Sequence, residues 1–387
     1  MISRITDEAR YYGWLAVNYM MIAMPLGMYI SVLCFTKKQK VKTMLSTYTL
    51  RDIEVVSRTG GSSRYSLILF TALSAMSCFY VFYTIGYNPI LKVLSSGTDD
   101  LSILRMSASR GFEGNVYVRN ILALTLMPIL SYIWCFYLIK TRYVIDFFFF
   151  AGTFILSVSI LYYDFSKSPV LWYLLSFIFV IYYSTGKLNI SFAFLVFIIV
   201  ATLLSVFYAF SGVPVSDFIS YNSGPIGRIL LSQSAGLYFM FDLFPSEFPH
   251  IYFDSLSALV SSLLGSDYTE RAARLAMMTF NPEGIAAGTA GVMNSLYVGE
   301  AWANFGIVGV VLSPIWVGFV VQSCYIFFLR KPKSPMYLAF FVAFSVGGSI
   351  TGGVNDYIYN PGVVLVVLFA LMIVAVSKFI KETVNKI

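Results

Sequence analysis

The stretch YVIDFFFFAGTFILSVSILYY covers residues 143–163 and contains one charged side chain, Asp146. A helix needs about 20 consecutive apolar residues to cross a bilayer, and this run meets that length. A soluble domain has about 25% charged residues, whereas this chain of 387 residues has 12% and is 58% hydrophobic. The sequence therefore predicts an integral membrane protein, with membrane lipids as its surroundings.

Similar apolar runs lie on both sides of this stretch. They predict an all-α, polytopic transmembrane bundle with about nine spans, forming a single integral membrane domain over residues 1–387. The predicted spans are 11–35, 66–86, 117–139, 143–163, 169–184, 189–210, 300–329, 336–350 and 361–379.

The distribution of basic residues predicts the orientation of these spans. Lysine-rich connections alternate along the chain, and the net charge of +7 is read as this topological signal rather than as a nucleic-acid surface. The positive-inside rule then places the N-terminus outside and the C-terminus in the cytoplasm. The connections on the cytoplasmic side contain Lys37, Lys38, Lys40, Lys42, Lys140, Lys187, Lys331, Lys333 and Lys381.

Residues 211–299 form the one large predicted extramembrane loop, on the outer side. Two parts of it, GRILLSQSAGLYFMFDLFP (227–245) and IYFDSLSALVSSLLG (251–265), have the composition of amphipathic helices. We expect them to lie on or dip into the outer leaflet. If both crossed the membrane, the count would rise to eleven and the termini would keep their sides.

Basic residues on the outer side are mainly arginine rather than lysine. Because a guanidinium binds phosphate or carboxylate in a planar, bidentate way, this preference suggests an anion site; exposed arginines paired with nearby acids are the alternative. In DYTERAARLAMM (267–278) the spacing predicts a helix capped at Asp267, with Arg271 and Arg274 on one face. These two arginines could bind a diphosphate, or they could form local ion pairs with Asp267 and Glu270. The candidate substrate-binding arginines are Arg105, Arg110, Arg119, Arg271 and Arg274, with Arg228 as a catalytic candidate.

Glu300 lies where the long outer loop enters the predicted span 300–329. An acid at a membrane boundary is unfavourable unless it is paired or used, and Asn304 lies four residues on, on the same helix face. Gly306 and Gly309 would permit close helix contact. The alternative is an interfacial glutamate that is hydrogen-bonded to a neighbouring loop.

Two other outer segments offer polar groups. The loop 347–362 contains Asn355 and Asp356 and could contact a sugar or simply join two spans. His250 is the only histidine, which excludes a histidine-cluster metal site, and a lone histidine is more often structural than catalytic.

The run Leu296-Tyr297-Val298-Gly299-Glu300-Ala301-Trp302-Ala303-Asn304-Phe305-Gly306, followed by Gly309, resembles the "GE-aromatic-x-NFG-x-x-G" signature of Wzy-type O-antigen and capsule polymerases. Two further stretches resemble that family: Gly227-Arg228-Ile229 with Gln233, Gly236, Tyr238 and Phe244-Pro245, and Leu104-Arg105 before a span containing Pro128. Together these stretches cover about a third of the chain.

The resemblance implies a metal-independent glycosyltransferase without cofactors in the bacterial inner membrane. Its partner would be an undecaprenyl-pyrophosphate-linked oligosaccharide, polymerised into O-antigen or capsular polysaccharide at the periplasmic face, with a chain-length regulator as a further candidate partner. Glu300 would be the catalytic base, and Asp242, Asp254 and Asp356 are alternative bases. Arg228 would stabilise the leaving pyrophosphate, and Asn304 would bind substrate.

Two alternatives remain at this stage. An O-antigen ligase would share the arginine-rich outer face, and a flippase for the same lipid would show broken helices or ionisable residues near mid-membrane. A P-loop, a GxSxG elbow and an HExxH motif are absent from the sequence, which disfavours a familiar ATP-driven pump or lipase.

Overall fold

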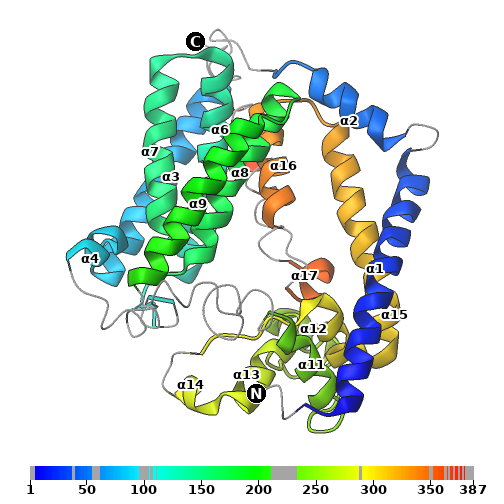
Figure 1. Ribbon diagram of the computed structural model, residues 1–387. Coiled ribbons are helices and arrows are strands. Elements are labelled where there is room, and N and C mark those ends of the chain that lie inside the picture. The colour runs from blue at the N-terminus through cyan, green and yellow to red at the C-terminus, as the bar shows by residue number, and fades with distance from the viewer. Residues whose placement is uncertain are drawn as a thin grey trace. The chain divides into compact units, whose positions relative to one another are not determined.

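The computed structural model describes residues 5–36, 40–54, 62–95, 104, 108–109, 111–210, 233–286, 290–347 and 352–360, with scattered positions between 364 and 379. The regular elements among these residues are all helical (Figure 1). Six of the described helices are long and apolar enough to cross a membrane: Asp7–Thr36, Arg64–Ile85, Val118–Thr141, Val144–Leu161, Lys167–Thr185 and Leu296–Arg330. The chain is therefore an α-helical membrane protein.

Most of the predicted spans coincide with helices. The run 143–163 forms α7 (Val144–Leu161), and 189–210 and 336–350 form α9 (Ile190–Phe210) and α16 (Pro335–Gly347). The apolar helical stretches Ile190–Val206 of α9 and Pro335–Val346 of α16 are shorter than the six above, and most of 361–379 lies outside the described residues. The total of about nine spans therefore stays a prediction.

The helices group into two compact units. The first contains residues 1–41, 213–327 and 349–360, and the second contains residues 42–212, 328–348 and 361–387. Each unit joins segments that are distant in sequence, and each is described here by itself.

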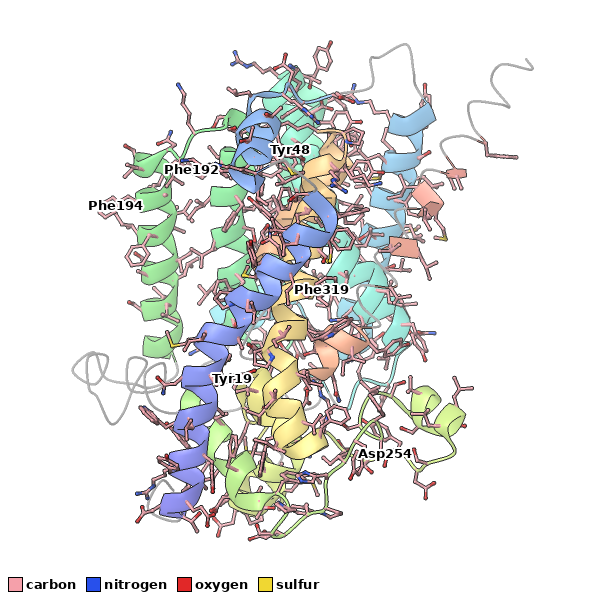
Figure 2. The ribbon with its side chains drawn as sticks, turned by 90° about the vertical axis from the view of Figure 1, so that its right-hand side faces the viewer. Tyr19, Tyr48, Phe192, Phe194, Asp254 and Phe319 are labelled. Carbon is pink, nitrogen blue, oxygen red and sulfur yellow. The ribbon has the colours of Figure 1, made fainter. Side chains whose placement is uncertain are left out.

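In the first unit, α1 (Asp7–Thr36) and α15 (Leu296–Arg330) run parallel in direct backbone contact (Figures 1 and 2). A Cβ at Gly27 would overlap the carbonyl oxygen of Ile315, and one at Gly318 would overlap that of Met24. The Tyr19 hydroxyl donates to the Val311 carbonyl at 3.0 Å. Glycine at the contact lets the two backbones approach as small residues do in membrane helix pairs.

Helix α15 is broken at Gly306, where the sequence predicted one continuous span with Gly306 at a helix contact. Gly306 has φ 59° and ψ −141°, a conformation open essentially to glycine alone. The break frees backbone carbonyls, and a distant segment takes them: Ile251 N–H donates to the Ala303 oxygen at 3.2 Å and Tyr252 N–H to the Asn304 oxygen at 2.9 Å. The break is therefore filled by protein.

The described part of the loop before α15, residues 233–286 and 290–295, contains four short helices: α11 (Gln233–Leu243), α12 (Ala258–Leu264), α13 (Ala272–Phe280) and α14 (Pro282–Ala286). Helix α11 is largely enclosed by protein, because Phe239, Met240 and Leu243 pack with Ile5 and Ala9 of the N-terminal segment. The apolar residues of α11 therefore form a core with the N-terminal segment, and the expectation that 227–245 lies on or dips into the outer leaflet stays a prediction.

The capped start predicted at Asp267 was wrong. Helix α13 begins at Ala272, with Arg271 as its extended N-cap (φ −62°, ψ 144°). The preceding residues bind a distant turn instead: Thr269 N–H donates to the Asp254 carbonyl at 3.1 Å, and the Ser266 hydroxyl donates to the Asp254 carboxylate at 2.5 Å. These tertiary hydrogen bonds hold 266–270 out of the helix.

The second unit is centred on α6 (Leu126–Thr141), whose residues from Leu126 to Tyr137 are all buried. Around it lie α3 (Ser62–Ile85), α7, α8 (Lys167–Thr185) and α16, and a π-helix, η2 (Val118–Thr125), leads into it. Arg64 pairs with the buried Asp146 of α7, which also accepts a hydrogen bond from Thr141. The single acid of the stretch 143–163 is therefore neutralised within the unit.

The short helix α2 (Val41–Leu50) is held to the segment before α16 by a buried lysine. The Lys333 ammonium donates to the carbonyls of Thr49 at 2.9 Å and Arg51 at 2.8 Å. Glu54 N–H donates in turn to the Lys333 carbonyl at 2.9 Å. Lys333 therefore caps the carbonyls at the end of α2, and it is also one of the basic residues from which the sequence predicts the topology.

Candidate functional site

The first unit gathers three charged side chains at the start of α15. Arg271 donates to both oxygens of Glu300, from Nε at 2.8 Å and from Nη2 at 3.0 Å. Its Nη1 donates to the Asp356 carboxylate at 3.0 Å. Asp356 lies in α17 (Asn355–Ile358), so the cluster joins α13, α15 and α17. One guanidinium therefore bridges two carboxylates.

A network of neutral polar side chains lies behind these charges. The backbone N–H of Asn355 donates to Glu300 Oε2 at 3.0 Å, so that carboxylate accepts three hydrogen bonds in all. The Asn304 amide donates to Asn355 Oδ1 at 2.9 Å, and the Asn355 amide donates to the Ser255 hydroxyl at 3.0 Å. Glu300, Asn304, Asn355 and Ser255 are all buried. The network fixes α17 and the turn at Ser255 against the start of α15.

The turn before α17 closes tightly over the carboxylate. A Cβ at Gly353 would overlap both Glu300 Oε2 and the guanidinium of Arg271. Gly353 N–H donates to Asp356 Oδ2 at 3.3 Å, which orients the second acid. Glycine at this position lets the backbone cover Glu300 at contact distance.

The three charged groups differ sharply in exposure. The Glu300 side chain is 1% exposed, whereas those of Arg271 and Asp356 are 36% and 42% exposed. Burial alone would lower the pKa of Arg271, but the hydrogen bonds and charge of Glu300, with those of Asp356, raise that pKa above its ordinary value. Arg271 is therefore a fixed cation, and Asp356 is the carboxylate that a ligand can reach.

The contacts of Glu300 agree with the alternative interpretation of its sequence context, a boundary glutamate that is hydrogen-bonded to neighbouring loops. A base must come within hydrogen-bond reach of the proton that it accepts. Glu300 is enclosed, and its oxygens already accept from Arg271 and Asn355. Glu300 holds Arg271 in place, and Asp356, which the sequence offered as an alternative base, has the accessible oxygens.

His250 lies beside the break in α15 at Gly306. His250 Nδ1 lies 3.2 Å from the Ala303 carbonyl oxygen, and its ring packs edge-on against Trp302, with 5.8 Å between ring centroids. Trp302 in turn donates from Nε1 to the Phe244 carbonyl at 2.9 Å. His250 thus contacts the broken turn of α15, as expected for a structural histidine.

The other predicted site residues are distributed as follows. Arg274 donates to the carbonyl oxygens of Ala290 and Gly291, at 3.5 and 2.9 Å, rather than to Asp267 or Glu270. Arg119 lies in the second unit, buried between the rings of Phe112 and Tyr163 and donating to the carbonyls of Ala108 and Ser109. Arg105, Arg110 and Arg228 lie outside the described residues.

Sequence reasoning found Glu300, Asn304 and Arg271 separately but did not join them. The pairing connects residues 29 and 85 positions apart, which spacing along one helix cannot show. A usable signal was present, because a boundary glutamate needs a cation, and Arg271 lies in the adjoining loop. No pattern in the sequence indicated that Ser255 would bind Asn355.

Comparisons with known proteins give no assignment: no family model, no curated protein and no solved structure matches the chain. Among the described residues, no group of three or more His, Cys, Asp or Glu side chains is arranged to hold a metal ion. The chemistry of the cluster has to be inferred from its own residues.

Proposed function

We propose that this protein is a glycosyltransferase that polymerises lipid-linked oligosaccharide repeat units, of the Wzy type. The observation that carries the proposal is the partly exposed guanidinium of Arg271. The buried Glu300 fixes this guanidinium, and the accessible Asp356 lies beside it. Glu300 and Asn304 belong to the stretch 296–309 that resembles the polymerase signature. The resembling motif and the charged cluster therefore coincide in one place.

The direction of α1 and α15 supports a site on the non-cytoplasmic side. Both helices begin at the end of the first unit that contains the cluster. At their other ends, Thr36 is followed by Lys37 and Lys38, and Arg330 by Lys331. The positive-inside rule assigns the lysine-rich ends to the cytoplasm. The cluster would then face the periplasm, where undecaprenyl-pyrophosphate-linked sugars are polymerised.

The proposed reaction transfers the growing glycan from its diphosphate carrier. A hydroxyl of the terminal sugar on an acceptor repeat unit attacks the anomeric carbon of the donor glycan. The bond from that carbon to the diphosphate oxygen breaks, and the electron pair leaves with the diphosphate. Arg271 would stabilise the charge that develops on this leaving group, and Asp356 would accept the hydroxyl proton.

Chain-length ladders of surface glycan test the proposal. Deleting the gene should remove polymerised glycan while single repeat units persist. Arg271→Ala should abolish long chains, and Arg271→Lys should restore them only if charge without the planar fork suffices. Arg10→Ala, which removes an exposed pair with Asp7, is the matched control and should give wild-type ladders. A wild-type ladder from Arg271→Ala would remove the cluster from catalysis.

The same assay applies to the residues singled out by sequence alone. Glu300→Ala and Arg228→Ala should each abolish long chains in protein that inserts normally. Glu300 would act through Arg271, whereas Arg228 is proposed from the motif only.

The two alternative functions predict different results. A ligase requires a core acceptor, so a purified protein that makes ladders from the lipid-linked repeat unit alone is not a ligase. A flippase gains some support from the broken helix α15, because discontinuous helices are common in transporters. However, the Ala303 and Asn304 carbonyls beside the break accept hydrogen bonds from Ile251 and Tyr252, so the break is occupied by the protein's own backbone. The polymerase therefore remains the better proposal.

A further inference from the structure

The loop that fills the break in α15 carries exposed aromatic side chains. Tyr252 is 59% exposed and Phe253 is 42% exposed. Both pack against half-buried Phe305 of α15, with ring centroids 6.4 and 5.0 Å apart. We call these three residues the aromatic ledge; Asp254, labelled in Figure 2, follows it directly.

The ledge is rigidly tied to the charged cluster. Tyr252 N–H binds the Asn304 carbonyl at 2.9 Å, and Asn304 lies about one helical turn from Glu300. Ser255 accepts from Asn355, the neighbour of Asp356, and the Asp254 carbonyl accepts from Thr269, two residues before Arg271. Each end of the loop is therefore anchored within a few residues of a charged group.

The backbone of Tyr252 makes its exposure informative. Its φ is 52°, in the left-handed region that glycine occupies without penalty and bulky residues avoid. Phe165, another aromatic residue with positive φ (58°), is buried and gains packing in return. Tyr252 remains mostly in the open, so folding gains little from its ring. The exposed face of this ring is therefore available to a molecule from outside the chain, either a lipid or a ligand of the charged cluster.

We propose that the aromatic ledge binds a pyranose ring of the lipid-linked glycan beside Arg271 and Asp356. This inference rests on the proposed function and names the sugar subsite of the same site. Aromatic faces bury the apolar face of a ring, and nearby polar groups fix its orientation. The ledge would hold the acceptor sugar while Arg271 binds the diphosphate.

Direct binding tests the ledge without requiring turnover. The probe is undecaprenyl-pyrophosphate-linked glycan extracted from cells that lack this protein, titrated into the purified full-length chain. Tyr252→Gly should weaken binding about tenfold, the scale expected for one lost aromatic contact. Its melting temperature should not fall, because glycine relieves the left-handed backbone. Tyr252→Phe, which keeps the ring, should bind within about twofold of wild type.

A leucine variant separates sugar from lipid. Tyr252→Leu keeps apolar contact with a membrane but has no ring, so its affinity should fall as that of Tyr252→Gly does. Wild-type affinity in either variant overturns the ledge. If the wild-type protein binds the glycan but makes no ladders, the polymerase function is overturned and the ledge stands. If the wild-type protein makes ladders but Tyr252→Gly binds the glycan with wild-type affinity, the ledge is overturned and the polymerase function stands. Failure of the wild-type protein to bind overturns both.

Discussion

Glu300 and Asp356 contact the same guanidinium, yet their removal should have different consequences. Glu300→Gln removes charge from a buried group that accepts three hydrogen bonds, and should lower the free energy of unfolding by about 1.5–3 kcal/mol. Asp356→Asn changes a half-exposed pair and should lower it by less than about 1 kcal/mol. Thermal unfolding of the purified variants measures both. Equal destabilisation would contradict the assignment of Glu300 as the buried holder of Arg271.

Gly306 allows a second residue-level prediction. Gly306→Ala forces a side chain into a conformation reserved for glycine and toward the ring of His250. The variant should lose about 1–3 kcal/mol of stability. Gly291→Ala, where an added Cβ has no neighbour within 4 Å, is the control and should unfold like the wild type. An unaffected Gly306→Ala protein would mean that α15 continues through this position.

Among the helices, the parallel pair α1 and α15 depends on two glycines. Gly27→Ala and Gly318→Ala each place a methyl group against a backbone carbonyl that cannot retreat without moving a helix. Each should cost about 1–3 kcal/mol, as overpacking does elsewhere. Gly152→Ala in α7, where the added methyl group meets open space, should be tolerated. Thermal unfolding in detergent compares the three, and equal melting temperatures would argue against the backbone contact.

The attachment of α2 depends on one side chain. Lys333→Met keeps much of the apolar stem but leaves the carbonyls of Thr49 and Arg51 without their donor. The variant should be destabilised by about 1–3 kcal/mol, and α2 should become easier to cleave by protease. Lys331→Met, a change at the neighbouring lysine, is the comparison. Equal protease resistance in the two variants would contradict the capping role.

Hydropathy predicted the long helices well, because a run as apolar as 143–163 is unfavourable in contact with water. Helix α7 occupies nearly the same residues. Hydropathy did not predict the break in α15 or the delayed start of α13. Both depend on hydrogen bonds from distant segments, Ile251 and Tyr252 in one case and Asp254 in the other. A local pattern contains no information on such partners.

At the scale of the molecule, the proposed function requires that the cluster of Arg271, Glu300 and Asp356 faces the periplasm. In a variant with its four native cysteines replaced, a cysteine at Leu263 should react with a membrane-impermeant maleimide added outside spheroplasts. A cysteine at Lys187 should react only after the membrane is opened. The reverse pattern would put Arg271 and Asp356 on the cytoplasmic side, away from the periplasmic face at which the proposed polymerisation takes place, and would end the polymerase proposal.

The site illustrates the limit of sequence at this scale. The sequence predicted only that Glu300, an acid at a membrane boundary, is unfavourable unless it is paired or used. The identity of that partner came from the fold, which brings Arg271 and Asp356 to Glu300 from two other segments. The roles of Arg105, Arg110 and Arg228 stay predictions from the sequence.

The contact between α1 and α15 also sets an order for biosynthesis. The ribosome releases α1 first, yet α15 follows about 260 residues later, which at about 5–20 residues per second is on the order of 10–50 s of translation. During that interval the helices of the second unit from α3 to α9 are made, whereas α16 follows α15. The face of α1 that contains Gly27 must therefore stay against lipid, or against an insertion chaperone, until the final quarter of the polypeptide emerges.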